Sequence, residues 1–228
     1  GTTFTTKTTT NGLGNNTVYG VYATGGTIYA ATGGGLSIST DGGNTFTNTT
    51  NGLGNNTVRG VYTTGGTIYA ATISGLSIST DGGTTFTNRT TANGMGNDNV
   101  FGVYANGSTI YAATYAGGLS ISTDGGTTFT NRTTANGLGN NTVNGVYANG
   151  SNVYAATDAG LSISTNGGTT FTNKTTTNGL GNNQVTGVYA NGSTIYAATY
   201  TGGLSISTDG GTTFTTKTTA NGLGNNTV

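Results

Sequence analysis

The stretch Ser39-Thr40-Asp41-Gly42-Gly43-Asn44-Thr45-Phe46 decides the fold, because close copies of it recur along the chain. Asn166 replaces the aspartate in the fourth copy, and the central positions 41, 81, 124, 166 and 209 are 40, 43, 42 and 43 residues apart. A period of this length indicates a repeat architecture in which each unit is one small supersecondary structure. The later copies are Ser79–Phe86, Ser122–Phe129, Ser164–Phe171 and Ser207–Phe214.

Four short β-like segments fill each repeat. In the first repeat they are residues 17–23, 27–32, 35–39 and 44–49, all rich in the Val, Ile, Tyr, Phe and Thr that favour strands. Leu and Ile alternate with Ser in residues 35–39, which is the two-residue period of a strand. Gly and Asp between the segments suit tight turns, and residues 51–56 cross to the next repeat. The sequence therefore predicts an all-β fold, a five-bladed β-propeller of four-stranded antiparallel blades.

The two ends of the sequence are copies of each other. Residues 1–18 match residues 211–228 except at Thr10, where the second copy has Ala220. We expect one propeller domain over residues 1–228 with a duplicated terminal strand, in which residues 1–17 are an extra fourth strand and connector. A surplus strand suits donation to a neighbouring subunit, and a chain cut from a longer tandem array would carry the same duplication. The expected blades are approximately residues 18–56, 57–98, 99–141, 142–183 and 184–228.

The recurring turn Ser-x-Asp-x-Gly-x-Thr-Phe resembles the Asp-box (BNR) repeat of sialidase-type propellers. The run from Asn51-Gly52-Leu53 through Ile68-Tyr69-Ala70-Ala71-Thr72 to Gly75-Leu76 resembles the repeat of two-component-regulator propellers. The Asp-box resemblance implies that the turn residues are fold elements on the hairpin between the third and fourth strands, away from a catalytic face. The side-chain oxygen of Asp or Asn can accept main-chain N–H bonds there, as in an Asx turn. The expected structural turn residues are Asp41, Asp81, Asp124, Asn166 and Asp209.

Composition narrows the function classes. Charged residues are 5% of the chain, and six basic side chains balance six acidic ones, so no field attracts nucleic acid or an anionic membrane. With no Cys and no His, the sequence predicts no metal site, no disulfide framework and no cofactor. No apolar run approaches the roughly 20 residues that span a bilayer. Low charge and many Asn-x-Ser/Thr sequons favour an extracellular or cell-surface glycoprotein. The candidate N-glycosylation sites are Asn15, Asn48, Asn55, Asn88, Asn106, Asn131, Asn140, Asn149, Asn173, Asn191 and Asn225.

The residues that a sialidase-like enzyme needs are missing. Such an enzyme holds its substrate carboxylate with an arginine cluster, but Arg89 and Arg132 share one repeat position on the fourth strands of separate blades. Four of the six aspartates belong to the turns, which leaves Asp98 and Asp158 in different blades. Glycosidases generally need two carboxylates within about 5–10 Å. The sequence therefore predicts that the protein is not an enzyme.

The positions that differ among the near-identical repeats are the candidate binding site. One set follows the first-strand Val, and the other lies in the link between strands two and three. Both should fall at the blade end opposite the Asp-box turns, although neutral drift of exposed loops gives the same pattern. Tyr115 and Tyr200 could stack on sugar rings, whereas the tyrosines at 22, 62, 104, 147 and 189 should pack between blades. The candidate rim residues are Tyr19, Arg59, Phe101, Asn144, Ile73, Tyr115, Asp158 and Tyr200.

Two functions follow from these observations. The first is a non-enzymatic extracellular structural propeller, a subunit of a surface fibre, sheath or appendage that self-associates through its surplus terminal strand. The alternative is a glycan-binding, lectin-like module or a sensor-input binding module that uses the variable rim. Neither function requires a nucleic acid partner or a membrane span.

Overall fold

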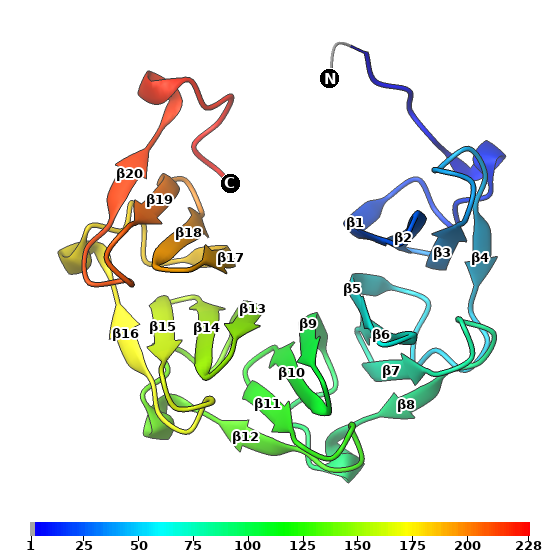
Figure 1. The fold of residues 1–228 in the computed structure, drawn as a ribbon, viewed down its shortest axis with the longest axis horizontal. Coiled ribbons are helices and arrows are strands. Elements are labelled where there is room, and N and C mark those ends of the chain that lie inside the picture. The colour runs from blue at the N-terminus through cyan, green and yellow to red at the C-terminus, as the bar shows by residue number, and fades with distance from the viewer. Residues whose placement is uncertain (1–2) are drawn as a thin grey trace. The chain divides into compact units, whose positions relative to one another are not determined.

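The computed structural model describes residues 3–228 and contains five four-stranded antiparallel sheets. Each sheet is formed by four strands that follow one another in the chain and pair in sequence order, and we number these sheets as blades 1 to 5 (Figure 1). The all-β fold of five four-stranded blades predicted from the repeat period is confirmed. Two compact units share the blades, residues 1–92 with 98–103 and residues 93–97 with 104–228, and each is described by itself.

The first unit contains blades 1 and 2 and the start of β9. Its connectors include single 3-10 turns, which end at a glycine such as Gly12 in the left-handed conformation. The elements of this unit are η1 (Thr9–Asn11), β1 (Val18–Thr24), β2 (Thr27–Thr32), β3 (Gly35–Ser39), β4 (Thr47–Thr49), β5 (Val58–Thr64), β6 (Thr67–Thr72), β7 (Gly75–Ser79), β8 (Thr87–Arg89) and η2 (Thr91–Asn93), whose last residue lies in the second unit.

The second unit contains most of blade 3 and all of blades 4 and 5. Its elements are β9 (Val100–Asn106), β10 (Thr109–Thr114), β11 (Gly118–Ser122), β12 (Thr130–Arg132), η3 (Thr134–Asn136), β13 (Val143–Asn149), β14 (Asn152–Thr157), β15 (Gly160–Ser164), β16 (Thr172–Lys174), η4 (Thr176–Asn178), β17 (Val185–Asn191), β18 (Thr194–Thr199), β19 (Gly203–Ser207), β20 (Thr215–Lys217) and η5 (Thr219–Asn221).

The core lies between consecutive blades, and blades 3 and 4 show how. Tyr111 and Leu119 of blade 3 form one buried cluster with Val143, Val153 and Phe171 of blade 4. The same repeat positions of blades 4 and 5 form a second cluster, and those of blades 1 and 2 form a third. Within each unit, consecutive blades therefore stabilise each other through facing sides, because the alternation of side chains gives every strand two faces to bury.

The predicted extra fourth strand at the N-terminus is not formed. Residues 3–8 lie outside the sheets, and Phe4 is 93% exposed. The corresponding Phe214, in contrast, is 7% exposed beside β20, which pairs with β19. The physical reason is that a strand needs a partner edge, and every third strand in residues 3–228 already pairs with the fourth strand of its own blade.

Candidate functional site

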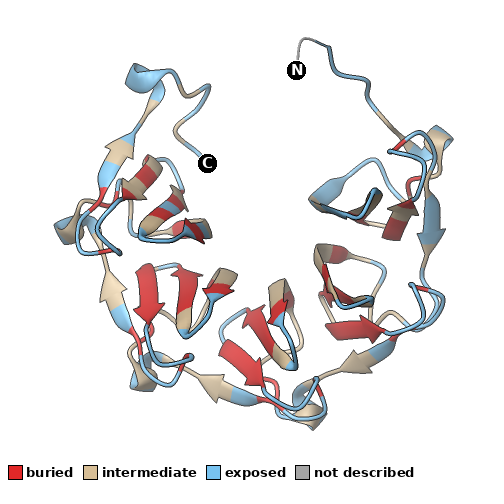
Figure 2. Cartoon of the chain, in the orientation of Figure 1, coloured by how far each residue is buried: buried red, intermediate tan, exposed pale blue. Residues whose placement is uncertain are grey.

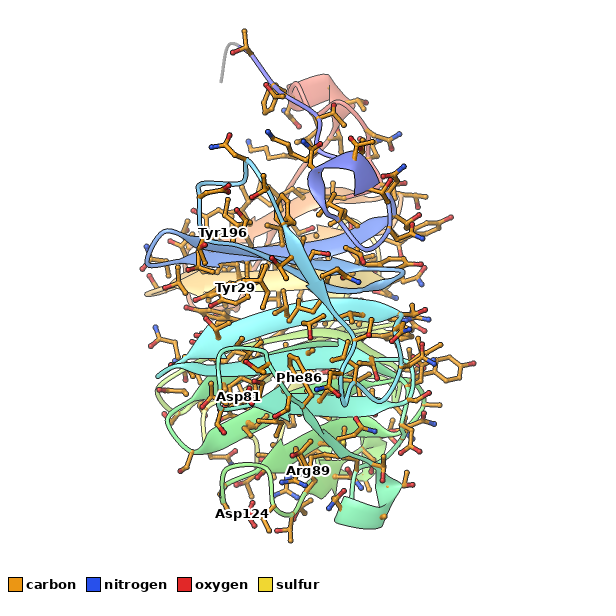
Figure 3. The ribbon with its side chains drawn as sticks, turned by 90° about the vertical axis from the view of Figure 1, so that its right-hand side faces the viewer. Tyr29, Asp81, Phe86, Arg89, Asp124 and Tyr196 are labelled. Carbon is orange, nitrogen blue, oxygen red and sulfur yellow. The ribbon has the colours of Figure 1, made fainter. Side chains whose placement is uncertain are left out.

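In blades 1, 2, 3 and 5 the turn between the third and fourth strands, which we call the Asp-box turn, is a network of hydrogen bonds around one carboxylate. In blade 2 (Figure 3), the Asp81 Oδ1 accepts from the Ser79 hydroxyl at 2.7 Å and from the main-chain N–H groups of Thr84 and Thr85 at 3.1 and 3.0 Å. The Thr85 hydroxyl donates to the other carboxylate oxygen at 2.6 Å. These bonds lower the pKa of Asp81 well below its usual range, and the Thr85 hydroxyl contributes most. The pKa is lowered in the same direction for Asp41, Asp124 and Asp209.

Asn166 keeps the turn of blade 4 without a charge. Its Oδ1 accepts from the Ser164 hydroxyl at 2.8 Å and from the Thr170 N–H at 3.0 Å. Its Nδ2 donates to the Thr170 hydroxyl at 2.8 Å, which reverses the direction of the bond that a carboxylate makes there. The Thr169 N–H bonds to the main-chain oxygen of Asn166 at 3.4 Å instead of to the side chain. In both the aspartate turns and the asparagine turn, the side chain is therefore used to hold the main chain of the turn.

The variable positions of a blade meet at one end of it. The link between strands two and three bonds to the residue before strand one, as in Ile73 N–H to the Thr57 oxygen at 3.4 Å and Tyr200 N–H to the Gln184 oxygen at 2.9 Å. The Asp-box turn bonds instead to the hairpin between strands one and two, as in Gly210 N–H to the Ser193 oxygen at 3.0 Å. We call the first end of each blade its rim.

A polar cluster occupies the rim of blades 4 and 5 in the second unit. The exposed carboxylate of Asp158 accepts from Asn144 Nδ2 at 2.9 Å and from Gln184 Nε2 at 3.3 Å. Asn144 Nδ2 also donates to the Val185 oxygen at 2.9 Å. Gln184, which the sequence analysis missed, holds the main chain of Tyr200, and the Tyr200 side chain is 50% exposed. The structure thus brings one carboxylate and two carboxamides together, and Gln184 links them to the main chain of Tyr200.

The other candidate rim residues are distributed over both units. In the first unit the Arg59 guanidinium stacks over the Phe101 ring at 4.7 Å, a cation–π contact. Tyr19 is 54% exposed and Ile73 is half-buried. In the second unit Tyr115 is 52% exposed.

The repeated tyrosines of the first strands contact one another, as expected from their repeat position. In the second unit the rings of Tyr104, Tyr147 and Tyr189 follow each other at centroid distances of 5.0 and 4.9 Å. Burial raises the pKa of Tyr147, and the neighbouring phenols add to the rise. In the first unit the rings of Tyr22 and Tyr62 lie 4.9 Å apart.

The Asp98 side chain takes part in a connector between blades. Its Oδ1 accepts the Thr91 N–H, a bond that Asn141 makes to Thr134 in the corresponding connector. Arg132 likewise has a packing role, since its Nε donates to the Gly168 oxygen in the next Asp-box turn at 2.8 Å. Asp98 and Asp158 are the two aspartates outside the Asp-box turns, and the Asp98 main-chain oxygen accepts the Gly75 N–H at 2.5 Å.

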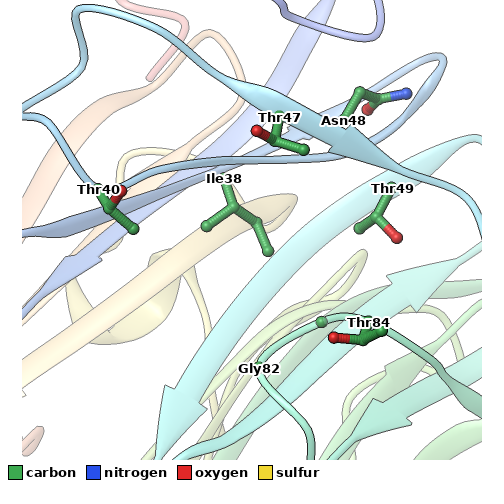
Figure 4. Close-up of a pocket in the computed structure, with 8 residues that line it drawn as sticks. Ile38, Thr40, Thr47, Asn48, Thr49, Gly82 and Thr84 are labelled. Atoms are coloured by element: carbon green, nitrogen blue, oxygen red, sulfur yellow. The ribbon is translucent and has the colours of Figure 1, made fainter.

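A groove in the first unit lies on the Asp-box side of blades 1 and 2. It encloses about 350 Å³ and is lined by Ile38 and Thr47 from blade 1 and by Gly82 and Thr84 from blade 2 (Figure 4). Its polar lining consists of hydroxyls and the Asn48 carboxamide, with no ionisable side chain. The groove can therefore offer hydrogen bonds but no acid or base.

The eleven sequon asparagines fall into three structural groups. In the fourth strands the carboxamide is engaged on both sides, as in Asn88, whose Oδ1 accepts from Ser77 and whose Nδ2 donates to the Ser74 oxygen at 2.7 Å. In the connectors Oδ1 accepts from the N–H two residues later. At the hairpin tips the asparagine is exposed. The fourth-strand group is Asn48, Asn88, Asn131 and Asn173. The connector group is Asn15, Asn55, Asn140 and Asn225. The hairpin-tip group is Asn106, Asn149 and Asn191.

Solved structures share the fold of this chain. The extracellular domain of a protein assigned as a hybrid two-component system from B. thetaiotaomicron matches with a TM-score of 0.73 and 20% identity over 89% of this chain and 30% of that chain. A second extracellular domain from the same organism, assigned to a one-component system, matches with a TM-score of 0.69 and 20% identity over 84% and 27%. A GH74 enzyme from Niastella koreensis matches with a TM-score of 0.59 and 25% identity over 91% and 33%.

These matches identify the chain as a β-propeller module. The chain spans about a third or less of the length of each of the three proteins. No protein-family model matches the sequence, and no curated protein matches it. Within residues 3–228, no helix has the length and apolar character to cross a membrane.

Proposed function

We propose that the protein is a non-enzymatic, extracellular structural propeller, a subunit of a surface fibre, sheath or appendage that associates with further copies of itself. One observation supports this proposal: within the second unit, no blade covers the second face of blade 5. Tyr196 on that face is 37% exposed, whereas Tyr69, Tyr111 and Tyr154 at the same repeat position are 4–5% exposed. Burial is also less complete in β19 than in β15 (Figure 2).

The uncovered face is apolar. Tyr196, Ala198 and Leu204 line a hollow of about 280 Å³ together with Val188 and Tyr189. The repeat positions of Tyr196 and Leu204 are fully packed in blade 4, where Leu161 has no exposed area. An exposed apolar surface of this kind marks an interaction site.

The absence of usable carboxylates supports a non-enzymatic role. Four aspartates hold turns, Asp98 holds a connector, and Asp158 is bonded to two carboxamides. An extracellular location is supported by the low charge of the sequence and by the extracellular domains among the structural matches.

Light scattering after size exclusion, with electron microscopy of the same fractions, tests the association. The native chain should form larger species as its concentration rises. Tyr196→Lys should remain monomeric, because a charge on the uncovered face opposes burial. Tyr200→Lys is the matched control, since it places the same charge on an exposed tyrosine of the same blade at the rim. A native chain that stays monomeric at every concentration would refute the proposal.

A second candidate function is glycan binding, or ligand input to a sensor, at the rim of blades 4 and 5. The cluster of Asp158, Asn144 and Gln184 beside the exposed Tyr200 favours it, because sugars are bound by carboxylate and carboxamide groups with an aromatic ring. Glycan-array binding that is lost in Tyr200→Ala and Asp158→Ala, but kept in Tyr115→Ala, would support this site; an array with no signal would exclude it.

A further inference from the structure

The groove between blades 1 and 2 recurs inside the second unit, between blades 4 and 5. Both grooves are lined by an isoleucine of the third strand, by the fourth strand and by the Asp-box turn of the following blade. Their volumes are about 350 and 220 Å³. The first is lined by residues 38, 40, 47, 49 and 82–84, and the second by the same repeat positions, residues 163, 165, 172, 174 and 210–212.

One repeat position differs strongly between these grooves. It is the residue of the fourth strand that pairs with the leucine of the third strand: Thr49 in blade 1, Arg132 in blade 3 and Lys174 in blade 4. The long Lys174 side chain lines the smaller groove, and the short Thr49 side chain lines the larger one. The size of the side chain at this position therefore accounts for how much of the groove is open.

Arg132 shows which chemical group fits such a groove. Its Nε donates to the Gly168 oxygen at 2.8 Å, and Gly168 belongs to the Asp-box turn of the next blade. The Arg132 side chain is half-buried. An isoleucine lies next to the same glycine, because a Cβ built at Gly168 would be 2.6 Å from Ile121 Cδ1. The groove thus offers an arginine one main-chain oxygen beside an apolar side chain.

The groove between blades 1 and 2 has the same geometry without the arginine. Gly83 is the counterpart of Gly168, with a φ of 90° against 85°. A Cβ built at Gly83 would be 2.7 Å from Ile38 Cδ1, so the isoleucine lies in the same place. Thr49 gives this groove only a short side chain, which Figure 4 shows on β4 opposite the turn of blade 2. The Gly83 oxygen is therefore the counterpart of the oxygen that receives Arg132, beside open space.

Two carboxylates flank the groove between blades 1 and 2. They belong to Asp41 and Asp81, each of which adjoins a lining residue in the chain. The hydrogen bonds of the turns lower the pKa of both aspartates, so both are ionised at neutral pH. Around Arg132 the same two turn positions are Asp124 and Asn166, which gives one carboxylate. The open groove therefore lies among more negative charge than the groove that already holds a cation, and no lining side chain of its own is cationic.

We propose that the groove between blades 1 and 2 binds an alkylguanidinium group, carried by an arginine residue of a partner polypeptide. The guanidinium donates to the Gly83 oxygen, as Arg132 does to the Gly168 oxygen, and the alkyl stem lies beside Ile38. A peptide-borne arginine is the occupant because the internal one is itself an arginine on a strand. The site does not depend on the self-association proposed above, since all its residues lie in blades 1 and 2.

Titration of the ¹⁵N-labelled chain, followed by NMR, tests the site. The probe is N-acetyl-arginine amide, and N-acetyl-lysine amide is the control with the same charge. The arginine probe should shift the amide signals of Gly83 and Thr84 and bind about tenfold more tightly than the lysine probe, because an ammonium group has no counterpart of the Nε–H donor. Equal affinities, or no saturable shift, would overturn the inference. Propylguanidinium that binds more tightly than the arginine probe would overturn the assignment to a polypeptide.

Two substitutions exchange the occupancy of the grooves. Thr49→Arg gives the groove an arginine of its own and should weaken probe binding at least tenfold. Arg132→Thr opens the groove between blades 3 and 4 and should create a second, weaker site, with shifts at Gly168. Thr17→Arg adds the same charge at the exposed rim of blade 1 and should leave binding unchanged. Binding that survives Thr49→Arg, that is lost equally in Thr17→Arg, or that gains no second site in a folded Arg132→Thr chain would contradict the proposed site.

Discussion

The buried hydroxyl of Ser77 donates a hydrogen bond to Asn88 Oδ1 across 3.1 Å, which ties the third strand of blade 2 to the fourth. The same hydroxyl accepts the Gly54 N–H from the incoming connector at 3.0 Å. One side chain thus joins two strands and the segment that arrives from the preceding blade. The arrangement recurs in blade 4, where Ser162 bonds to Asn173 and to Gly139.

Ser77→Ala should therefore lower the free energy of unfolding. Ser77 has no exposed area, and the substitution leaves a buried N–H group without its acceptor, which costs about 1–3 kcal/mol. Chemical denaturation measures the change. Ser108→Ala, at an exposed hairpin tip, is the control and should stay within about 0.5 kcal/mol of the native chain. Equal effects of the two substitutions would contradict the role of the buried hydroxyl.

Acid should destabilise the fold only at low pH. The folded state lowers the pKa of four turn aspartates, so these groups contribute stability that is fully present above their unfolded pKa of about 3.9. That contribution is lost as the pH falls below this value and through the lower folded pKa. Thermal unfolding should give a constant Tm from neutral pH down to about pH 5 and a falling Tm below about pH 4. A Tm that falls between pH 7 and 5 would contradict this prediction.

The carboxylate of an Asp-box turn should be replaceable by a carboxamide but not by a methyl group. Asp81→Asn should lower Tm less than Asp81→Ala, because Asn166 shows that a carboxamide retains the bonds to the serine hydroxyl and to the N–H four residues later. Asn166→Asp is the reciprocal change and should raise Tm while adding acid sensitivity. Thermal unfolding at pH 7 and pH 3 measures both effects; an Asp81→Asn chain as unstable as Asp81→Ala would argue against the turn network.

Cysteine pairs can locate the contact between copies, because the native chain has no cysteine. Inside the second unit, a Cβ built at Gly145 lies 3.7 Å from the Cα of Gly187 in the next blade. If the second face of blade 5 packs on the first face of blade 1 of another copy, the equivalent pair is Gly187 of one copy and Gly20 of the other. The short distance between Gly145 and Gly187 inside the chain indicates that cysteines at this pair could form a disulfide. Mixing separately prepared Gly187→Cys and Gly20→Cys chains should yield a cross-linked dimer under oxidation.

Gly25→Cys is the control for this cross-link. Gly25 lies at a hairpin tip of the same blade as Gly20, and a side chain there meets nothing within 4 Å. A mixture of Gly25→Cys and Gly187→Cys should remain uncross-linked. Cross-linking that is equally efficient in both mixtures would show random collision and not a defined contact.

The sequence predicts the strands well because the hydrophobic alternation and the turns agree within each repeat. The third strand of blade 1 begins and ends at Gly35 and Ser39, as expected. The predicted strand over residues 44–49 is shorter, Thr47–Thr49, because the turn network around Asp41 includes Asn44 and Thr45. Local pattern therefore predicts the strands, while side-chain hydrogen bonds set their ends.

The sites were harder to predict, because they depend on contacts between repeats. Asn88 reads as a glycan acceptor in the sequence, but its carboxamide joins Ser77 to the Ser74 oxygen in the structure. In the sequence, Gln184 differs from the repeat only by replacing the Thr found at positions 17 and 57, which does not indicate a site. In the structure, its side chain donates a hydrogen bond to Asp158 and completes the cluster. The uncovered face of blade 5 has the same sequence as the buried faces, so only its surroundings distinguish it.

In the proposed association, the second face of blade 5, which carries Tyr196, would meet the first face of blade 1 of another copy, which carries Val18, and these are different surfaces. A contact between unlike surfaces has no two-fold symmetry, so successive copies all point the same way and build either a closed ring or an open helical filament. A filament of this kind has two chemically distinct tips.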